Sequence, residues 1–220
     1  MADMGLARRV WTPAKPSRAR PVRHLDFERL LGRAAWLSLS ADTRARFRTG
    51  AEPRVYEGGM GVRASFAGLL IAQVCRLIGQ PLAPWRGEDV PVSVSVSTDK
   101  DGSLVWDRLY RFPKKRPCFV TSRKVADHRG MVEMVRGGLG MALNVTVEDG
   151  ALHFRSRGYF VEIAGLRVPL PGLLTPGKAH VIHRDLGGGR FLFSLDFRHP
   201  WLGQTLWQEG VFADPPAAGA

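Results

Sequence analysis

The stretch "NVTVEDGALHFRSRGYF", residues 144–160, alternates apolar and polar side chains on both sides of Asp149-Gly150. Alternation with a period of two is typical of half-buried strands, and an Asp-Gly pair favours a tight hairpin turn. The side chains expected on the buried face are Val145, Val147, Leu152 and Phe154. Those expected to face water or neighbouring strands are Glu148, His153 and Arg155. The stretch therefore predicts an antiparallel hairpin.

The same alternation fills most of the chain after Pro91. The segment "VPVSVSVSTDKDGSLVWDRLYRF", residues 90–112, predicts two strands joined by a turn at 99–102. Further strands are expected at 119–126, 131–136, 139–147, 152–160, 179–184, 191–197 and 204–212. The separators are short, which excludes parallel crossovers and favours antiparallel pairing. A sheet of about nine strands curls, and its concave face must be filled.

Two segments upstream have helical spacing. The first predicts an N-terminal helix at 26–37. The second, "SFAGLLIAQVCRLI" at 65–78, is apolar on nearly all sides, begins with a capping serine and precedes Gly79. Because a helix without a polar face is usually buried, we expect helix 66–78 to fill the concave face. Between them, "AEPRVYEGGMGVRAS" at 51–65 suggests a sharply bent strand, and 168–177 suggests a flap over an open end.

The predicted fold class is therefore α+β. It consists of a large curved antiparallel sheet of about nine strands packed around a mostly apolar helix, with a partly open barrel as an alternative. The chain has 220 residues, which favours one domain at 24–213. A leader at 1–23 and a tail at 214–220 are expected to be disordered.

The net charge is +12, and residues 4–24 hold six Lys or Arg and no acid. Such a leader is expected to make weak, non-specific contact with nucleic acid or an anionic membrane, or to be simply a solvated tail. The chain shows no secretory signal, and Cys75 and Cys118 form no metal or disulfide pattern. These features indicate a cytoplasmic protein. They leave its oligomeric state open.

No cofactor and no metal are expected. His180 and His183 lie three residues apart on a predicted strand, so their side chains point to opposite faces. The glycines of "RGGLGMAL" and "DLGGGRF" lack the GxGxxG spacing of a dinucleotide loop, and no GxSxG or Cys/His signature is present. Catalytic residues cannot be named from these patterns.

One strand carries the candidate binding residues. Strand 104–112 places Trp106, Arg108 and Tyr110 on one face. An arginine among aromatic rings suits a carboxylate or phosphate, with the rings holding the apolar part of a ligand. Alternatively, Arg108 stacks on Trp106 or pairs with Glu133 across the sheet.

Glu133 is the candidate acid or base. Its neighbours on the same strand face, Met131 and Val135, are apolar, which would raise the pKa of its carboxyl group. The alternative is an ordinary ion pair, for which the candidate partners are Arg108, Arg123 and Lys124.

The order of motifs in the second half resembles the bacterial family called domain of unknown function 4166. The motifs are Glu133 before a bend with Gly137, Gly138 and Gly140, the hairpin at 149–159, "LPGLLTPG" at 170–177, the strands at 183–193 and the segment at 199–212. With the upstream hairpin, Ser122 and Lys124, the resemblance spans residues 27–212. The family has no assigned activity. The resemblance implies an accessory role for an oxidoreductase or membrane system.

Two functional hypotheses follow. The first is a domain that binds a hydrophobic or lipid-like small molecule, or a partner protein, in the concave face of the sheet. The residues expected to bind it are Trp106, Arg108, Tyr110, Glu133 and His183. The alternative is an enzyme of unknown reaction, with Glu133 or His183 as acid or base and Arg108 as the anion binder.

Overall fold

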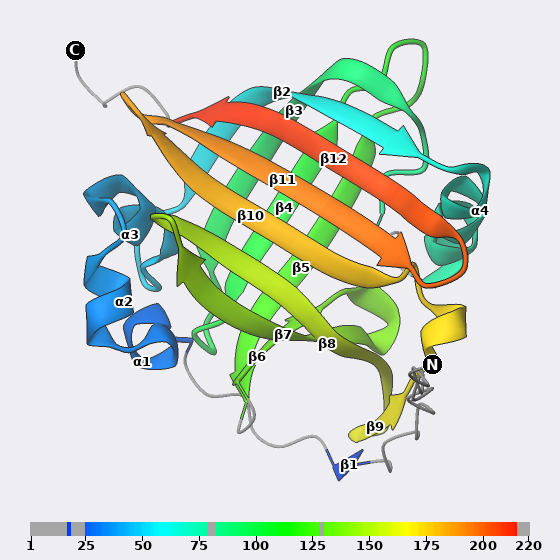
Figure 1. Cartoon of the computed structure of the whole chain (residues 1–220), viewed down its shortest axis with the longest axis horizontal. Coiled ribbons are helices and arrows are strands. Elements are labelled where there is room, and N and C mark those ends of the chain that lie inside the picture. Colours follow the sequence, from blue (N-terminus) through cyan, green and yellow to red (C-terminus); the bar gives the residue numbers. More distant parts are fainter. Residues whose placement is uncertain (1–16, 19–24, 79–81, 128–129, 215–220) are drawn as a thin grey trace, which may run out of the picture.

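The computed structural model describes residues 17–18, 25–78, 82–127 and 130–214. Ten antiparallel strands close into a barrel (Figure 1). The barrel strands are β2 (Arg54–Ala64), β3 (Gly87–Thr98), β4 (Leu104–Tyr110), β5 (Cys118–Asp127), β6 (Gly130–Met134), β7 (Leu139–Glu148), β8 (Ala151–Ile163), β10 (Lys178–Gly187), β11 (Arg190–His199) and β12 (Gly203–Ala213). Their order is β8-β10-β11-β12-β2-β3-β4-β5-β6-β7, and pairing of β7 with β8 closes the ring.

An extra strand lies outside the ring. β9 (Leu166–Pro169) pairs with the end of β8, and the two-residue β1 (Ser17–Arg18) pairs with β9. The rest of the predicted leader and residues 215–220 of the predicted tail lie outside the described residues.

Alternation along each strand determines which side chains point into the barrel. On β3 the valines at even positions, 90 to 96, are buried, whereas the serines between them lie on the outer side. The register pairs Val94 with Arg108 and Val96 with Trp106, so these two residues of β4 share the inner face. The antiparallel sheet inferred from period-two alternation is thereby confirmed.

All nine strands predicted from alternation are present, with ends that differ by a few residues. The tenth is β2, the segment expected to be a bent strand, and its pairing with β12 and β3 joins the two halves of the barrel. Glycine is needed within it, because a Cβ on Gly58 would lie 2.3 Å from the carbonyl oxygen of Val211. The fold is mostly β and a closed barrel, so the α+β class was wrong.

The helices are few and short. They are α1 (Phe27–Leu31), α2 (Arg33–Leu37), α3 (Ala41–Phe47), α4 (Phe66–Cys75) and the 3-10 turns η1 (Arg76–Ile78), η2 (Arg136–Gly138) and η3 (Gly172–Leu174). The single helix expected at 26–37 is broken at Gly32, whose φ is 82°. A positive φ cannot continue a right-handed helix. No helix in the described ranges is long and apolar enough to cross a membrane.

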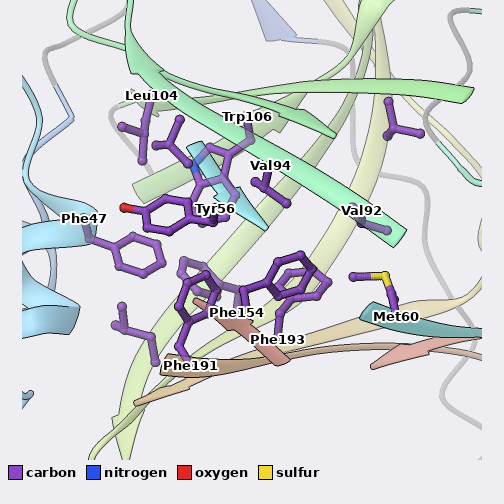
Figure 2. Packing of buried hydrophobic residues seen from close by; sticks show 14 of the residues in the cluster. Phe47, Tyr56, Met60, Val92, Val94, Leu104, Trp106, Phe154, Phe191 and Phe193 are labelled. Carbon is purple, nitrogen blue, oxygen red and sulfur yellow. The ribbon is translucent and has the colours of Figure 1, made fainter. Parts of the chain in front are cut away.

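Helices α1 to α3 close one end of the barrel, and we call them the plug (Figure 1). Phe47 is the innermost side chain of the plug, with its ring 5.6 Å from Trp106 and 5.9 Å from Phe154 (Figure 2). Phe27 packs edge-on against Phe47 at 5.1 Å. The plug therefore continues the aromatic core that the strands build inside the barrel.

A buried arginine fixes the plug to the barrel wall. The guanidinium of Arg46, on α3, donates two hydrogen bonds to the carboxylate of Asp214, at 2.9 and 2.7 Å, and one to Asp185 at 2.9 Å. Its side chain is 2% exposed. Asp214, which we assigned to the tail, is thus held at the plug end.

Helix α4 does not fill the barrel, and that expectation was wrong. It lies at the end opposite the plug, against β12 and β2 (Figure 1). Its inner side consists of Gly68, Ala72 and Cys75, whereas four large apolar side chains of α4 and η1 face outward. The inward side chains of ten strands already occupy most of the interior, which leaves a cavity but no room for a helix.

Candidate ligand-binding site

A cavity of about 170 Å³ lies inside the barrel, between the plug and α4. Phe47 of the plug closes its inner end. At the other end lie apolar side chains of α4, of the segment 82–86 before β3 and of the connection from β9 to β10, which form what we call the mouth: Ile71, Cys75, Leu82, Leu170 and Leu174. Most of the remaining lining is apolar, including Val120, Phe154, Val181, Phe193 and Phe197.

The connection at 168–177, expected as a flap, lies at this mouth. The Tyr159 hydroxyl donates to the carbonyl of Gly177 at 2.7 Å, and the Thr205 hydroxyl donates to the carbonyl of Pro176 at 2.5 Å. Both bonds tie the connection to barrel strands. The flap is thus anchored at its C-terminal end, while Leu173 and Leu174 are exposed.

All five residues predicted as ligand-binding lie on the cavity lining, and the closed sheet brings them together from three strands. They are Trp106, Arg108 and Tyr110 of β4, Glu133 of β6 and His183 of β10. The hydroxyl of Tyr110 already has a hydrogen-bond partner, because it donates to Oε1 of Gln208 at 2.9 Å. The binding role of the five residues stays a prediction.

Arg108 is a half-buried cation in largely apolar surroundings. Its guanidinium donates to the hydroxyl of Ser122 at 3.1 Å and lies 5.5 Å from the Trp106 ring and 5.8 Å from the Phe193 ring. The expected stacking on Trp106 is confirmed. In the described part of the chain no carboxylate forms a salt bridge with Arg108, so most of its N–H donors remain available.

Glu133 forms the ion pair that was the alternative to an acid or base role. Lys124 and Glu133 are direct partners in the β5–β6 register, and Lys124 Nζ lies 3.0 Å from Glu133 Oε1. Burial alone would raise the pKa of Glu133, but the charges of Lys124 and Arg108 and hydrogen bonds from Ser122 and Lys124 lower it to about 2. The expected upward shift was therefore wrong. Glu133 is a carboxylate at neutral pH.

Sequence reasoning did not place Lys124 in the site. Its side chain is 7% exposed, and its ammonium lies 4.7 Å from the Trp106 ring. Burial lowers the pKa of Lys124, and the charge of Glu133 opposes that shift. Alternation along β5 could have indicated this position, because Ser122 and Lys124 lie on the same face of the sheet as the inward residues of β4. With Arg108 and Lys124 against Glu133, this wall carries one excess positive charge.

Two further lining residues have unpaired polar atoms. Trp106 Nε1 and both ring nitrogens of His183 are buried and have no hydrogen-bond partner within the described residues. The His183 ring stacks on Phe191 at 4.4 Å and meets Phe47 edge-on at 4.9 Å. Burial, helped by the charge of Arg46, lowers the pKa of His183 to about 3, so the ring is neutral. Buried polar atoms of this kind normally find a partner.

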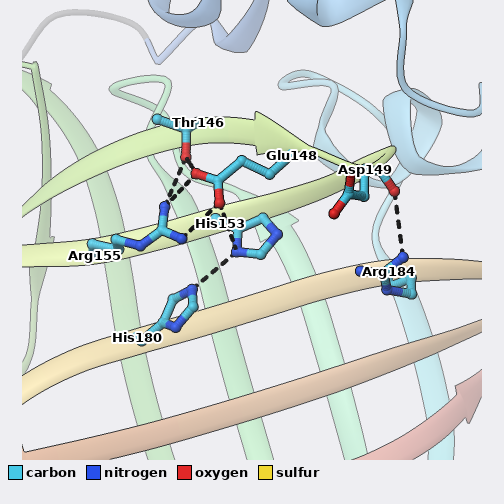
Figure 3. Close-up of polar contacts among 7 residues, drawn as sticks. All are labelled: Thr146, Glu148, Asp149, His153, Arg155, His180 and Arg184. Atoms are coloured by element: carbon cyan, nitrogen blue, oxygen red, sulfur yellow. Dashed lines mark hydrogen bonds and ion pairs between the residues drawn. The ribbon is translucent and has the colours of Figure 1, made fainter.

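Four polar residues of the hairpin at 144–160, namely Thr146, Glu148, His153 and Arg155, lie on the outer face (Figure 3), whereas Tyr159 lines the cavity. Arg155 pairs with the carboxylate of Glu148 at 2.7 Å, and His153 Nδ1 lies 2.9 Å from His180 Nε2. The prediction that His180 and His183 point to opposite faces is confirmed, since His183 lines the cavity. Among the residues placed by the structure, no three or more His, Cys, Asp or Glu form a potential metal site.

The chain is thus a closed antiparallel β-barrel with a plug at one end and a largely apolar cavity that opens beside a short helix. Residues 39–212 match the family model described as Domain of unknown function (DUF4166), and the chain belongs to this family. The match covers α3, α4 and all but the last residue of the barrel strands. The family inferred from the motifs is confirmed. No curated protein and no solved structure matches the chain.

Proposed function

We propose that the barrel binds a small amphiphile, with its anionic group against Arg108 and its apolar part in the cavity. The observation that carries this proposal is a guanidinium inside an apolar cavity that contacts a hydroxyl and two aromatic rings and forms no salt bridge within the described residues. A carboxylate or phosphate would accept its free N–H donors and balance the excess charge of this wall. Mostly apolar cavities with a few convergent polar groups are typical ligand sites.

The volume of the cavity limits the size of the group that it can enclose. The cavity measures about 170 Å³, close to the roughly 150 Å³ that holds a benzene molecule in a dry protein cavity. The enclosed part of the ligand is therefore an aromatic ring or a short aliphatic segment. A longer tail would extend through the mouth between α4 and the 168–177 flap. Trp106 Nε1 and the neutral His183 ring offer further hydrogen bonds to polar atoms of the ligand.

The enzyme alternative has less support. With pKa values near 2 for Glu133 and 3 for His183, neither group exchanges a proton readily near neutral pH. We therefore favour binding over catalysis. An accessory role beside an oxidoreductase or membrane system, a partner protein and a cytoplasmic location all stay predictions, as does weak nucleic-acid or membrane contact through the leader.

Calorimetric titration with octanoate and with octanol tests the proposal. Wild-type protein is expected to bind octanoate more tightly, because only octanoate carries a charge for Arg108. Arg108→Met keeps an apolar side chain of similar length and is expected to weaken octanoate binding by about tenfold or more, since hydrogen bonds to charged groups contribute about 1.5–3 kcal/mol. Arg111→Met is the matched control, because Arg111 is exposed and donates to Ser93 on the outer face.

A second variant tests the location. Val181→Phe adds a ring to the cavity lining and is expected to reduce binding of both probes. Native mass spectrometry of the purified protein would show a co-purifying anion. Equal affinity of the wild type for octanoate and octanol, or unchanged octanoate binding by Arg108→Met, would contradict the proposed charge recognition. Unchanged binding by Val181→Phe would place the ligand elsewhere.

A further inference from the structure

The mouth end of the barrel carries exposed apolar side chains. Four of them, Phe66, Leu70, Val74 and Leu77, follow helical spacing and form the outward face of α4 and η1, and Phe66 and Leu77 are 82% and 87% exposed. We call these four the apolar rim, together with Leu173 and Leu174 of η3 and Trp201 and Leu202 of the β11–β12 turn. Grouped apolar exposure of this kind marks interaction sites.

The three segments of the rim border one another at Thr205, which is completely buried. Its carbonyl accepts a hydrogen bond from the backbone N–H of Ser65, at the start of α4, at 3.0 Å. Its hydroxyl donates to Pro176, just after η3, at 2.5 Å. Because Thr205 follows the β11–β12 turn, this one residue joins α4, η3 and the turn. In Figure 1 all three lie at the end away from the plug.

The connections around the rim carry positive charge. The described connections at the mouth end, residues 65–78, 82–86, 111–117, 135–138, 164–177 and 200–202, contain eight Lys or Arg and no Asp or Glu. These are Arg76, Arg86, Arg111, Lys114, Lys115, Arg116, Arg136 and Arg167. Arg167 pairs with Glu162 at the end of β8, and Glu88 at the start of β3 lies 4.0 Å from Arg63.

The plug end carries charges of both signs. Its segments 25–53, 99–103 and 149–150 contain seven Asp or Glu and six Lys or Arg. The positive charge of the folded part is thus concentrated on the end that also exposes the apolar rim. Cations interleaved with Trp, Phe and Leu are the composition of surfaces that lie in the membrane interface.

We propose that the mouth end docks on a membrane surface that contains anionic lipids. The apolar rim enters the interfacial region, and the surrounding lysines and arginines contact the headgroup phosphates, each contributing electrostatic attraction. The mouth would then face the bilayer, and an amphiphile would pass between membrane and cavity without crossing water. Of the rim residues, Leu174 also lines the cavity and the other seven do not, so this proposal stands without the ligand assignment.

Flotation with lipid vesicles tests the docking. Wild-type protein is expected to float with vesicles of phosphatidylcholine and phosphatidylglycerol, and much less with phosphatidylcholine alone. The double variant Phe66→Ser with Leu77→Ser removes the two most exposed α4–η1 side chains of the rim and is expected to weaken binding at least about tenfold. The double variant Lys115→Glu with Arg116→Glu is expected to weaken vesicle binding by a similar factor and to make vesicle binding less dependent on salt.

Matched controls come from the plug end. Leu37→Ser with Val55→Ser alters exposed apolar residues there, and Arg33→Glu with Lys100→Glu reverses exposed charges there. Both controls are expected to bind vesicles like the wild type. The basic leader is identical in all these variants, so docking through the leader alone would make all of them bind equally. That result would overturn the proposal.

Two other outcomes would also overturn it. One is an absence of wild-type binding to the anionic vesicles. The other is a wild-type oligomer that the Phe66 and Leu77 substitutions convert to a monomer, because the rim would then be covered by a second copy. Octanoate titration separates this proposal from the proposed function. Rim variants are expected to bind octanoate normally, and Arg108→Met is expected to bind vesicles normally.

Discussion

The ammonium nitrogen of Lys124 lies 3.0 Å from a carboxylate oxygen of Glu133, between paired positions of β5 and β6 on the cavity wall. This pair balances one of the two cations at that wall and leaves the charge of Arg108 without a carboxylate partner among the described residues. The pair therefore matters both for stability and for the electrostatic character of the cavity.

Breaking the pair should be costly. Lys124→Met leaves the buried carboxylate of Glu133 without its ammonium partner and is expected to lower the free energy of unfolding by about 3–5 kcal/mol. Urea denaturation measures the change. The double variant with Glu133→Leu is expected to recover most of the loss, because no buried charge is left unpaired. A double variant no more stable than Lys124→Met alone would disprove this account.

Acid should weaken the same pair. The pKa of Glu133 is about 2 in the folded protein, below its ordinary 4.5. A depressed carboxyl pKa stabilises the fold fully above the unfolded value, and that contribution is lost as pH falls from about 4.5 through about 2. The difference in unfolding free energy between wild type and Glu133→Gln is expected to shrink across this window. Urea titrations at several pH values would measure it, and a constant difference would argue against the lowered pKa.

His183 should add a second pH dependence. Its folded pKa is about 3, below its ordinary 6.5, so below pH 6.5 the unfolded chain gains a proton that the folded protein does not. The wild type is expected to lose roughly 1.4 kcal/mol of unfolding free energy per pH unit from this group as pH falls toward 3. His183→Leu is expected to lack that part of the slope. Identical slopes for both proteins would contradict a neutral buried ring.

The contact of α4 with the barrel depends on Gly68. Alanine normally favours a helix over glycine by about 1 kcal/mol. Here a Cβ on Gly68 would lie 1.8 Å from the carbonyl oxygen of Thr205, so Gly68→Ala is expected to destabilise the protein and to speed hydrogen exchange in residues 66–75. Gly172→Ala is the control, because its Cβ would meet nothing within 4 Å. A stabilised Gly68→Ala variant would contradict the close packing.

The strands could be predicted because the alternation of apolar and polar residues shows directly which face of the sheet each side chain lies on. Residues such as Val94 and Trp106 on the inner side, and Ser93 and Asp107 on the outer side, follow from a period of two. Closure could not be predicted, because it depends on β2, where Gly58, Gly59 and Gly61 interrupt the alternation. Gly58 and Gly61 permit close approach to β12, and Gly59 permits close approach to Asp89 of β3, but glycines carry no apolar signal.

The candidate site was only partly predictable. The three inward residues of β4 could be predicted from the alternation along that single strand. The pairing of Lys124 with Glu133 depends on the register between two strands, which alternation does not give. The position of α4 was missed for a different physical reason. Its uniformly apolar sequence is typical of burial, and a sequence does not distinguish apolar side chains packed in a core from those exposed at a rim.

The hydrogen bonds between Arg46 and Asp214 have a practical use when the protein is immobilised on a surface. Asp214 is held at the plug end by two hydrogen bonds to Arg46, on the opposite side of the barrel from the mouth. An affinity tag joined after this point would immobilise the protein with its cavity entrance directed toward the solution. Ligands or vesicles flowing over such a surface would meet the entrance first.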